Sequence, residues 1–217
     1  MAARKPPDIP GYSNYQRLPS MVLGFHGCDK SVGEAVLKGK VPHLETSANE
    51  YDWLGGGIYF WENDPLRAME WAIAGMSKPN ITKGKITKPF VIGAVIELGH
   101  CLNLLSRNSI EEVKVSHRVM LKAMETAQIE VPKNTGYGGF RRSLDRAVIE
   151  FLHVSRGREV PPLQPYDTVR AAFREGGPAY GGKGPLESMA GFDNRSHIQI
   201  AVRDKTKIKG YFRPIHD

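Results

Sequence analysis

Residues 51–71 read YDWLGGGIYFWENDPLRAMEW and combine a glycine run, a short aromatic strand and a helix start. The β-branched and aromatic residues 58–61 predict a strand. Asp64 followed by Pro65 predicts an N-cap and a first helical turn. The glycines at 55–57 permit backbone conformations and close approaches that a Cβ would prevent. We therefore expect a glycine-lined strand edge beside a group of aromatic rings.

The helix that begins at Pro65 is expected to bury one face. Small or apolar residues recur at the spacing of a helical stripe: Leu66, Ala68, Met69, Ala72 and Ile73. Gly75 follows the stripe and is predicted to end the helix. Alone, this pattern is typical of a buried strand-turn-helix, so a functional interpretation depends on a second segment.

That second segment is Gly24-Phe25-His26-Gly27, which follows a short apolar stretch at residues 21–23. Together, His26-Gly27 and the later Gly57-Ile58-Tyr59-Phe60 resemble the motifs of ADP-ribosyltransferases of the diphtheria-toxin and poly(ADP-ribose) polymerase class. In that class, His-Gly lies on the first strand and Gly-Ile-Tyr-Phe lies on the next motif strand. A helix rich in small residues follows, as it does here.

The third motif position of this class is usually a glutamate on a later strand. Residues 196–203, SHIQIAVR, resemble that strand, and Gln199 stands in place of the glutamate. The whole chain also resembles a group of poorly characterised bacterial proteins with the same pattern, which includes an Asp-Arg-Ala-Val-Ile-like helix and an Ile-Lys-Gly-Tyr-Phe-Arg-Pro ending. The resemblance implies an α+β fold in which two antiparallel sheets form a split core with surrounding helices.

The resemblance also implies that NAD binds where the three motif positions converge. The implied catalytic residues are His26, Tyr59 and Gln199. The implied NAD-binding residues are His26, Gly27, Ser47, Tyr51, Gly57 and Tyr59. Gly27 is expected to offer backbone hydrogen bonds to the nicotinamide amide, and Tyr59 to supply an aromatic face and a hydroxyl.

The loop before the third motif strand often contributes to recognition of the acceptor in this superfamily. By that resemblance, the acceptor-binding residues are Phe173, Glu175, Tyr180 and His197. The segment after Phe173 contains several glycines and is expected to change shape easily.

The implied reaction breaks the nicotinamide–ribose bond of NAD through an oxocarbenium-like state and transfers ADP-ribose to a macromolecule. A glutamate would stabilise that positive charge, whereas Gln199 can hydrogen-bond to the ribose but carries no charge. We therefore expect transfer of single ADP-ribose units by a toxin or defence effector, with nucleic acid slightly favoured over protein as the acceptor.

Three residues are candidates for the missing carboxylate or base: Glu150, Glu175 and His197. A surface ion pair is the simpler interpretation of Glu150, and a satisfied core histidine is the simpler interpretation of His197. Two other functions remain open. One is an NAD glycohydrolase, in which water is the acceptor, and the other is a non-catalytic module that binds NAD or ADP-ribose.

The length of 217 residues fits one domain at 21–217, preceded by an extended arm at 1–20 that is rich in proline and polar residues. The formal net charge of +7 favours a nucleic acid, or an acidic antitoxin or inhibitor, as a partner, with a solvated basic face as the alternative. No apolar run reaches the roughly 18–20 residues that cross a bilayer, and the N-terminus lacks a signal-peptide core. A cytoplasmic protein without membrane contact is expected.

The two cysteines, Cys28 and Cys101, suggest neither a disulfide framework nor a zinc site, and no metal is expected. Neither a P-loop nor a Rossmann glycine fingerprint is present, so the prediction of NAD depends on the resemblance.

Other elements follow from local patterns. Ser31 with Glu34, and Ser109 with Glu112, have the spacing of capping boxes and predict helices that end at Gly39 and near Gln128. A further helix is expected over residues 144–155. Strands are predicted at residues 90–98, 168–173, 198–202 and 208–212.

Overall fold

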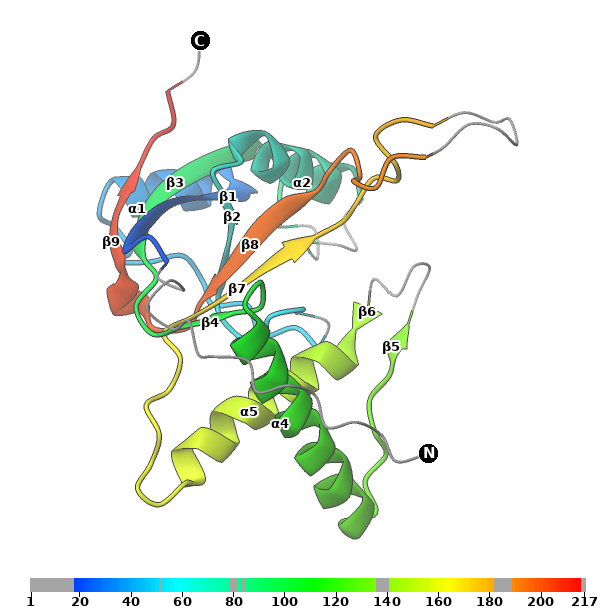
Figure 1. The fold of residues 1–217 in the computed structure, drawn as a ribbon. Helices are drawn as coiled ribbons and strands as arrows, with labels where there is room; N and C mark the ends of the chain where they lie inside the picture. Colours follow the sequence, from blue (N-terminus) through cyan, green and yellow to red (C-terminus); the bar gives the residue numbers. More distant parts are fainter. Residues whose placement is uncertain are drawn as a thin grey trace.

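The computed structural model describes residues 18–50, 52–78, 82, 85–135, 141–181 and 189–215, and these form an α+β fold (Figure 1). In chain order the elements are β1 (Met21–Asp29), α1 (Lys30–Leu37), β2 (Ile58–Glu62), α2 (Pro65–Ser77), β3 (Pro89–Glu97), β4 (Cys101–Asn103), α4 (Arg107–Thr126), β5 (Asn134–Thr135), β6 (Arg141–Arg142), α5 (Ser143–Arg158), β7 (Thr168–Phe173), β8 (His197–Val202) and β9 (Ile208–Phe212). The α+β class predicted from the sequence is therefore confirmed.

The main sheet has seven strands in the order β4-β7-β8-β2-β1-β3-β9. Its pairs are antiparallel except β4 with β7, which are parallel. β1 pairs with β3 over nine residue pairs but with β2 over only two, Gly24–Glu62 and Phe25–Trp61. The expected two sheets are therefore joined into one by a short ladder, and the sheet is close to split at the β1–β2 joint.

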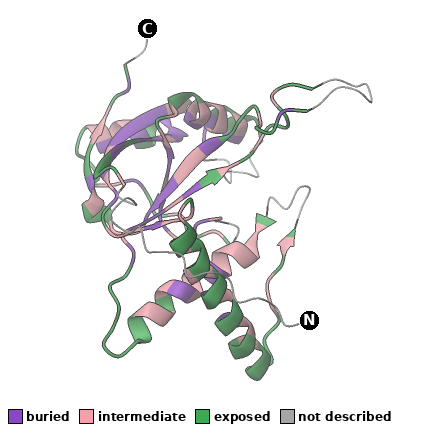
Figure 2. Ribbon diagram, viewed as in Figure 1, coloured by how far each residue is buried: buried purple, intermediate pink, exposed green. Residues whose placement is uncertain are grey.

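Two large apolar clusters pack against the sheet, and a smaller third cluster lies beneath α2 and consists of Phe25, Trp61, Ala68 and Val91. The first surrounds Phe60 and includes Ile58, Ile92, Ile96, Ile200, Val202 and Val36 of α1. The second joins β7 and β8 to α5 and includes Leu102, Ile149, Leu152, Val169 and Ala201. Figure 2 shows buried residues concentrated in the strands and exposed residues along α4. Helices α4 and α5 pack against each other at the β4–β7 side of the sheet.

Helix α2 approaches β1 unusually closely at Gly27. A Cβ at Gly27 would lie 2.1 Å from the carbonyl oxygen of Ala68. The buried positions of α2 are accordingly its smallest residues, Ala68, Ala72 and Gly75. Position 27 therefore requires a residue without a Cβ, so that α2 can pack this close to β1.

The predicted α2 stripe was wrong for Leu66 and Ile73, whereas Met69 is partly buried as predicted. Leu66 is 70% exposed and Ile73 is 46% exposed, because side chains of that size would hold the helix away from the sheet. Gly75 does not end the helix, which continues to Ser77, and a Cβ at Gly75 would lie 2.5 Å from Cγ2 of Thr82. Gly75 therefore permits another close contact.

The helix caps differ in part from the predictions. Asp64 caps α2 as predicted and accepts a hydrogen bond from the backbone of Arg67 at 2.8 Å. Ser31 does not cap α1, because the preceding Asp29 accepts hydrogen bonds from both the backbone and the hydroxyl of Ser31. Likewise, Ser106 caps α4 in place of Ser109. Both predicted capping boxes therefore started too late.

The Asp29 carboxylate also connects α1 to the start of β3. It accepts hydrogen bonds from the backbone and hydroxyl of Thr87 and from the backbone of Lys88. The hydrogen bonds from Ser31, Lys88 and Thr87 lower the pKa of Asp29 well below its ordinary value. A residue with this many partners fixes a chain junction, which the capping-box pattern alone did not reveal.

The longer predicted strands are confirmed to within one residue at each end. Helix α5 runs to Arg158, three residues beyond the prediction, and the short strands β4, β5 and β6 were not predicted. Both cysteines are free, and burial raises the pKa of Cys28 to about 12, so it packs as a thiol. No helix in the described ranges is both long and apolar enough to cross a membrane.

Replacing Gly27 by alanine should lower the free energy of unfolding by about 1–3 kcal/mol, because the added methyl group collides with the α2 backbone. Urea unfolding followed by circular dichroism would measure this. Gly210→Ala in β9 is the matched control, because a Cβ there meets nothing within 4 Å, and it should change stability by less than about 0.5 kcal/mol. Equal stability of the two variants would contradict the close α2–β1 contact.

Candidate functional site

The candidate site lies where β1 and β2 separate. Asn63 donates its backbone N–H to the carbonyl of Leu23 at 2.9 Å, so odd-numbered residues of β1 direct their backbone polar groups towards β2. Gly27 is odd-numbered and lies two residues beyond the last β1–β2 pair. Its N–H and C=O therefore face the gap between the strands.

A histidine side chain occupies the position of the next ladder bond. His26 Nδ1 lies 2.7 Å from the carbonyl oxygen of Tyr59, which in a continued ladder would pair with Gly27. The His26 ring also meets the Phe60 ring edge-on, with centroids 5.9 Å apart. His26 thus connects the two strands at the point where their backbones part.

This contact fixes the form of the imidazole. A carbonyl oxygen can only accept, so Nδ1 of His26 carries the proton, and Nε2 is left as an acceptor when the ring is neutral. Burial lowers the pKa of His26, and the hydrogen bond to Tyr59 opposes this only in part. At neutral pH the ring therefore presents an unprotonated Nε2.

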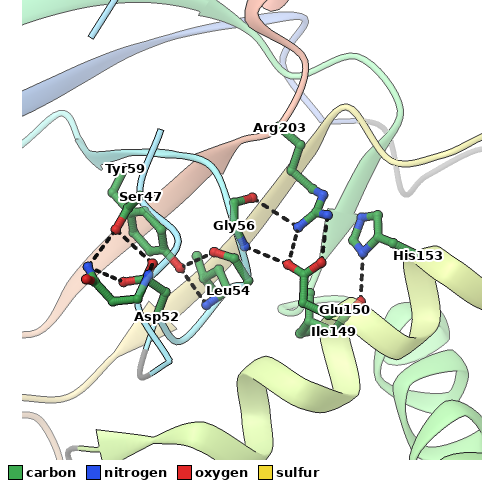
Figure 3. Close-up of polar contacts among 11 residues, drawn as sticks. Ser47, Asp52, Leu54, Gly56, Tyr59, Ile149, Glu150, His153 and Arg203 are labelled. Atoms are coloured by element: carbon green, nitrogen blue, oxygen red, sulfur yellow. Dashed lines mark hydrogen bonds and ion pairs between the residues drawn. The ribbon is translucent and has the colours of Figure 1, made fainter. Parts of the chain in front are cut away.

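The Tyr59 hydroxyl is engaged within the protein. It donates to the carbonyl of Gly55 at 2.7 Å and accepts from the backbone N–H of Leu54 at 2.9 Å (Figure 3). Burial raises the pKa of Tyr59 far above its ordinary value, so the hydroxyl stays protonated. Tyr59 can offer its ring to a ligand, but its hydroxyl holds the glycine loop.

Ser47 also supports this loop. Its backbone pairs with Gly57, and its hydroxyl donates to the carboxylate of Asp52 at 2.7 Å. Asp52 accepts a second hydrogen bond from the backbone of Asn49. The Ser47 hydroxyl that was predicted to contact NAD is thus already bonded to Asp52. Tyr51, the other predicted NAD contact in this segment, lies outside the described residues.

A second polar cluster braces the other side of the glycine loop. Glu150 of α5 accepts from the backbone of Gly56 at 2.6 Å and from Arg203 at 2.8 Å, and Arg203 also donates to the Gly56 carbonyl (Figure 3). Burial alone would raise the pKa of Glu150, but the hydrogen bonds from Arg203 and Gly56 lower it to about 2. Glu150 is therefore an ion-paired structural carboxylate, as in the simpler interpretation.

Gln199 lies on β8 opposite Trp61 of β2. Its side-chain nitrogen lies 2.9 Å from Nε2 of His197, and Nδ1 of His197 lies 2.6 Å from the carbonyl oxygen of Arg195. His197 is only 7% exposed, and its ring lies near those of Trp61 and Phe173. Gln199 and His197 therefore act as one hydrogen-bonded unit.

Of the four acceptor residues predicted from the sequence, Phe173 and His197 lie together, with ring centroids 5.8 Å apart. Phe173 packs against Trp53, with ring centroids 4.4 Å apart, whereas Glu175 is ion-paired with Arg67 of α2. Tyr180 lies farther out and is 62% exposed. The described parts of the β7–β8 connection, residues 174–181 and 189–196, project from the domain beyond β7 and β8 (Figure 1).

The three motif residues meet through the backbone of β2. Strand alternation puts His26 on the same face as Phe60, whereas Tyr59 and Gln199 point to the opposite face. β1, β2 and β8 are nevertheless adjacent strands, and His26 reaches Tyr59 in the gap of the sheet. The motif positions are thus brought to neighbouring strands without sharing one face.

Two buried donors near Gln199 were not predicted. Trp61 Nε1 and Arg67 Nε find no hydrogen-bond acceptor among the described residues. The Arg67 guanidinium lies over the Trp61 ring, 5.7 Å from its centroid. Trp61 lies two residues beyond Tyr59, so the period-2 pattern of the strand could have indicated its shared face.

Within the described parts of the chain, no three His, Cys, Asp or Glu side chains gather closely enough to hold a metal ion. Comparison with known proteins gave no matching family model, no matching curated protein and no matching solved structure.

The Glu150–Arg203 pair predicts a specific pH dependence of stability. Because the folded-state pKa of about 2 lies below the ordinary value of 4.5, the carboxylate stabilises the fold above about pH 4.5, and this contribution is lost as the pH falls towards 2. Glu150→Gln should lower the free energy of unfolding by about 1.5–3 kcal/mol at pH 7. Urea unfolding from pH 3 to 7 should show the gap to the parent protein shrinking at low pH.

The matched control is Glu125→Gln, an exposed carboxylate on α4, which should change stability by less than about 0.5 kcal/mol throughout. A gap for Glu150→Gln that stays constant down to pH 3 would contradict the lowered pKa of Glu150.

Proposed function

We propose that the protein is an NAD-dependent mono-ADP-ribosyltransferase whose site lies at the β1–β2 gap. The observation that carries this proposal is the backbone of Gly27, which lies beside His26 and beyond the last β1–β2 residue pair. An extended residue directs its N–H and C=O to the same side, so Gly27 offers one donor and one acceptor to the gap. The nicotinamide carboxamide matches these groups, because its oxygen can accept from the Gly27 N–H and its NH₂ can donate to the Gly27 carbonyl.

Side chains around the gap suit the rest of the ligand. Nε2 of His26 can accept a hydrogen bond from a ribose hydroxyl, and the Tyr59 ring offers an aromatic surface. The buried N–H groups of Trp61 and Arg67 suit acceptor oxygens of a ligand. The joint of only two residue pairs between β1 and β2 supports the split-sheet ADP-ribosyltransferase fold that the motifs imply.

In the proposed reaction the bond between the ribose C1′ and the nicotinamide nitrogen breaks, and nicotinamide leaves with the electron pair. A nucleophilic atom of the acceptor then bonds to C1′, and any proton on that atom is released to solvent. Gln199 can accept a hydrogen bond from the ribose but adds no negative charge. Glu150 and Glu175 are held in ion pairs with Arg203 and Arg67, which supports transfer of single units over chain elongation.

The described part of the β7–β8 connection, residues 174–181 and 189–196, is the proposed contact for the acceptor. Its Tyr180 and Phe192 rings pack edge-to-face, with centroids 5.6 Å apart, and both remain more than half exposed. Arg174 and Arg195 at its base are also exposed. Exposed aromatic rings with nearby arginines suit unpaired nucleotides, because bases stack on such rings. We therefore favour a nucleic acid with unpaired bases as the acceptor.

Replacing His26 by alanine should lower kcat/KM for NAD at least about 100-fold, because the substitution removes the Nε2 acceptor at the gap. The assay incubates the purified protein with labelled NAD and separate pools of RNA, DNA and protein, and follows label transfer and nicotinamide release. Circular dichroism and urea unfolding would establish that the variant is folded.

His117→Ala on α4 is the control and should retain the parent activity. Full activity of the folded His26→Ala variant would remove the β1–β2 gap as the NAD site. Nicotinamide release without transfer to any pool would indicate a glycohydrolase, and tight NAD binding without release would indicate a binding module.

Replacing both Tyr180 and Phe192 by alanine should raise the apparent KM for a single-stranded acceptor about tenfold, because stacking contributes roughly 1–3 kcal/mol per base. Titration of the acceptor pool that takes up label would measure this. Leu163→Ala, which also removes an exposed apolar side chain, should leave that KM unchanged. An unchanged KM in the double variant would exclude the β7–β8 connection as the acceptor contact.

A further inference from the structure

The side chain of Gln199 is held by a histidine that is itself held by the backbone. His197 Nδ1 lies 2.6 Å from the carbonyl oxygen of Arg195, and Nε2 lies 2.9 Å from the amide nitrogen of Gln199. The His197 ring is buried, with the Phe173 ring centroid 5.8 Å away and that of Trp61 6.4 Å away. This packing leaves the imidazole little freedom to turn.

The order of donors and acceptors in this chain follows from the Arg195 carbonyl. A carbonyl cannot donate, so Nδ1 of His197 carries a proton. In the neutral ring Nε2 is an acceptor, and the group facing it must then be the NH₂ of Gln199, since its carbonyl oxygen could not donate. The Oε1 atom of Gln199 is therefore directed away from His197.

We propose that His197 is a positioning residue that fixes the Gln199 amide with its oxygen presented to the substrate. This inference rests on the proposed transferase function. An outward Oε1 can accept a hydrogen bond from a ribose hydroxyl, as one oxygen of a glutamate would. Its partial negative charge also suits the cationic transition state.

Without His197 the Gln199 amide would have no fixed orientation. Oxygen and NH₂ differ little in size, so an unrestrained Gln199 would present either group. An outward NH₂ would direct positive partial charge at the cationic ribose and would offer a donor where an acceptor is needed. His197 thus makes a neutral side chain act in one orientation only.

The same geometry disfavours a glutamate at position 199 while His197 is neutral. In Gln199→Glu, a carboxylate oxygen would face the lone pair of His197 Nε2, so one of the two groups would have to take up a proton. Gln199 and His197 therefore match each other as a pair.

The first test uses the protein without NAD. In ¹⁵N-labelled protein at pH 7.5, His197 should be protonated at Nδ1 only, and one Gln199 amide proton should show a hydrogen-bonded, downfield resonance. His197→Phe keeps a ring of similar size but removes the acceptor, and that resonance should move to the position of a free amide. A His197 ring protonated at Nε2, or a Gln199 resonance that is unaffected by His197→Phe, would overturn the proposal.

The second test asks whether His197 acts through Gln199. His197→Phe should lower kcat about fivefold to tenfold with little change in the KM for NAD, as expected for a hydrogen bond that matters in the transition state. In a Gln199→Met background the same substitution should have no further effect. A full additional loss in that background would assign His197 a role independent of Gln199.

His100→Phe is the matched control, because Nδ1 of His100 also lies against a backbone carbonyl, that of Pro165, at 2.9 Å. It should leave both the Gln199 resonance and kcat unchanged. If the parent protein fails to turn over NAD, the proposed function fails while the resonance test still decides the His197–Gln199 geometry.

Discussion

The hydrogen bond from His26 to the Tyr59 carbonyl determines how the rest of the site can be built. It satisfies a backbone acceptor that the β1–β2 ladder would otherwise pair with Gly27, and it does so with a side chain. The strands can therefore separate without leaving that buried carbonyl unpaired, which would cost about 1–3 kcal/mol. Gly27 is left with backbone groups directed at a gap, while α2 packs directly against its Cα. His26 thus connects β1 to β2 by a side-chain hydrogen bond at the point where the backbone ladder between them ends.

The polar residues around this gap are mostly structural. Tyr59 and Ser47 hold the glycine loop through Leu54, Gly55 and Asp52, and Glu150 with Arg203 holds the same loop at Gly56. A glycine-rich loop loses much conformational entropy when it is fixed, so several hydrogen bonds are needed to hold one shape. This rigidity matters because the loop leads directly into β2, where the Tyr59 carbonyl meets His26.

Local sequence patterns predicted the strands and the Asp64 cap, because β-branched runs and Asp-Pro pairs act through local geometry. They failed where contacts between distant residues decide. Asp29 displaced Ser31 as a cap because it also binds Thr87 and Lys88, and the exposed Leu66 follows from the close contact at Gly27. The orientation of Gln199 could not be predicted at all, since it depends on which atom of His197 the Arg195 carbonyl engages. The alternation of β8 indicated only that His197 and Gln199 share a face.

Within the proposed activity, the neutral Gln199 restricts the kind of acceptor. Removing a proton from a hydroxyl acceptor needs a free base, but Glu150 and Glu175 are ion-paired, and Nε2 of His197 is occupied by Gln199. Nε2 of His26 is assigned to a ribose hydroxyl of NAD in the proposed complex. An acceptor that already has an unprotonated lone pair needs no such base. Ring nitrogens of unpaired nucleobases and phosphate oxygens have this property at neutral pH. The site geometry and the exposed Tyr180 and Phe192 rings therefore favour the same class of acceptor for independent reasons.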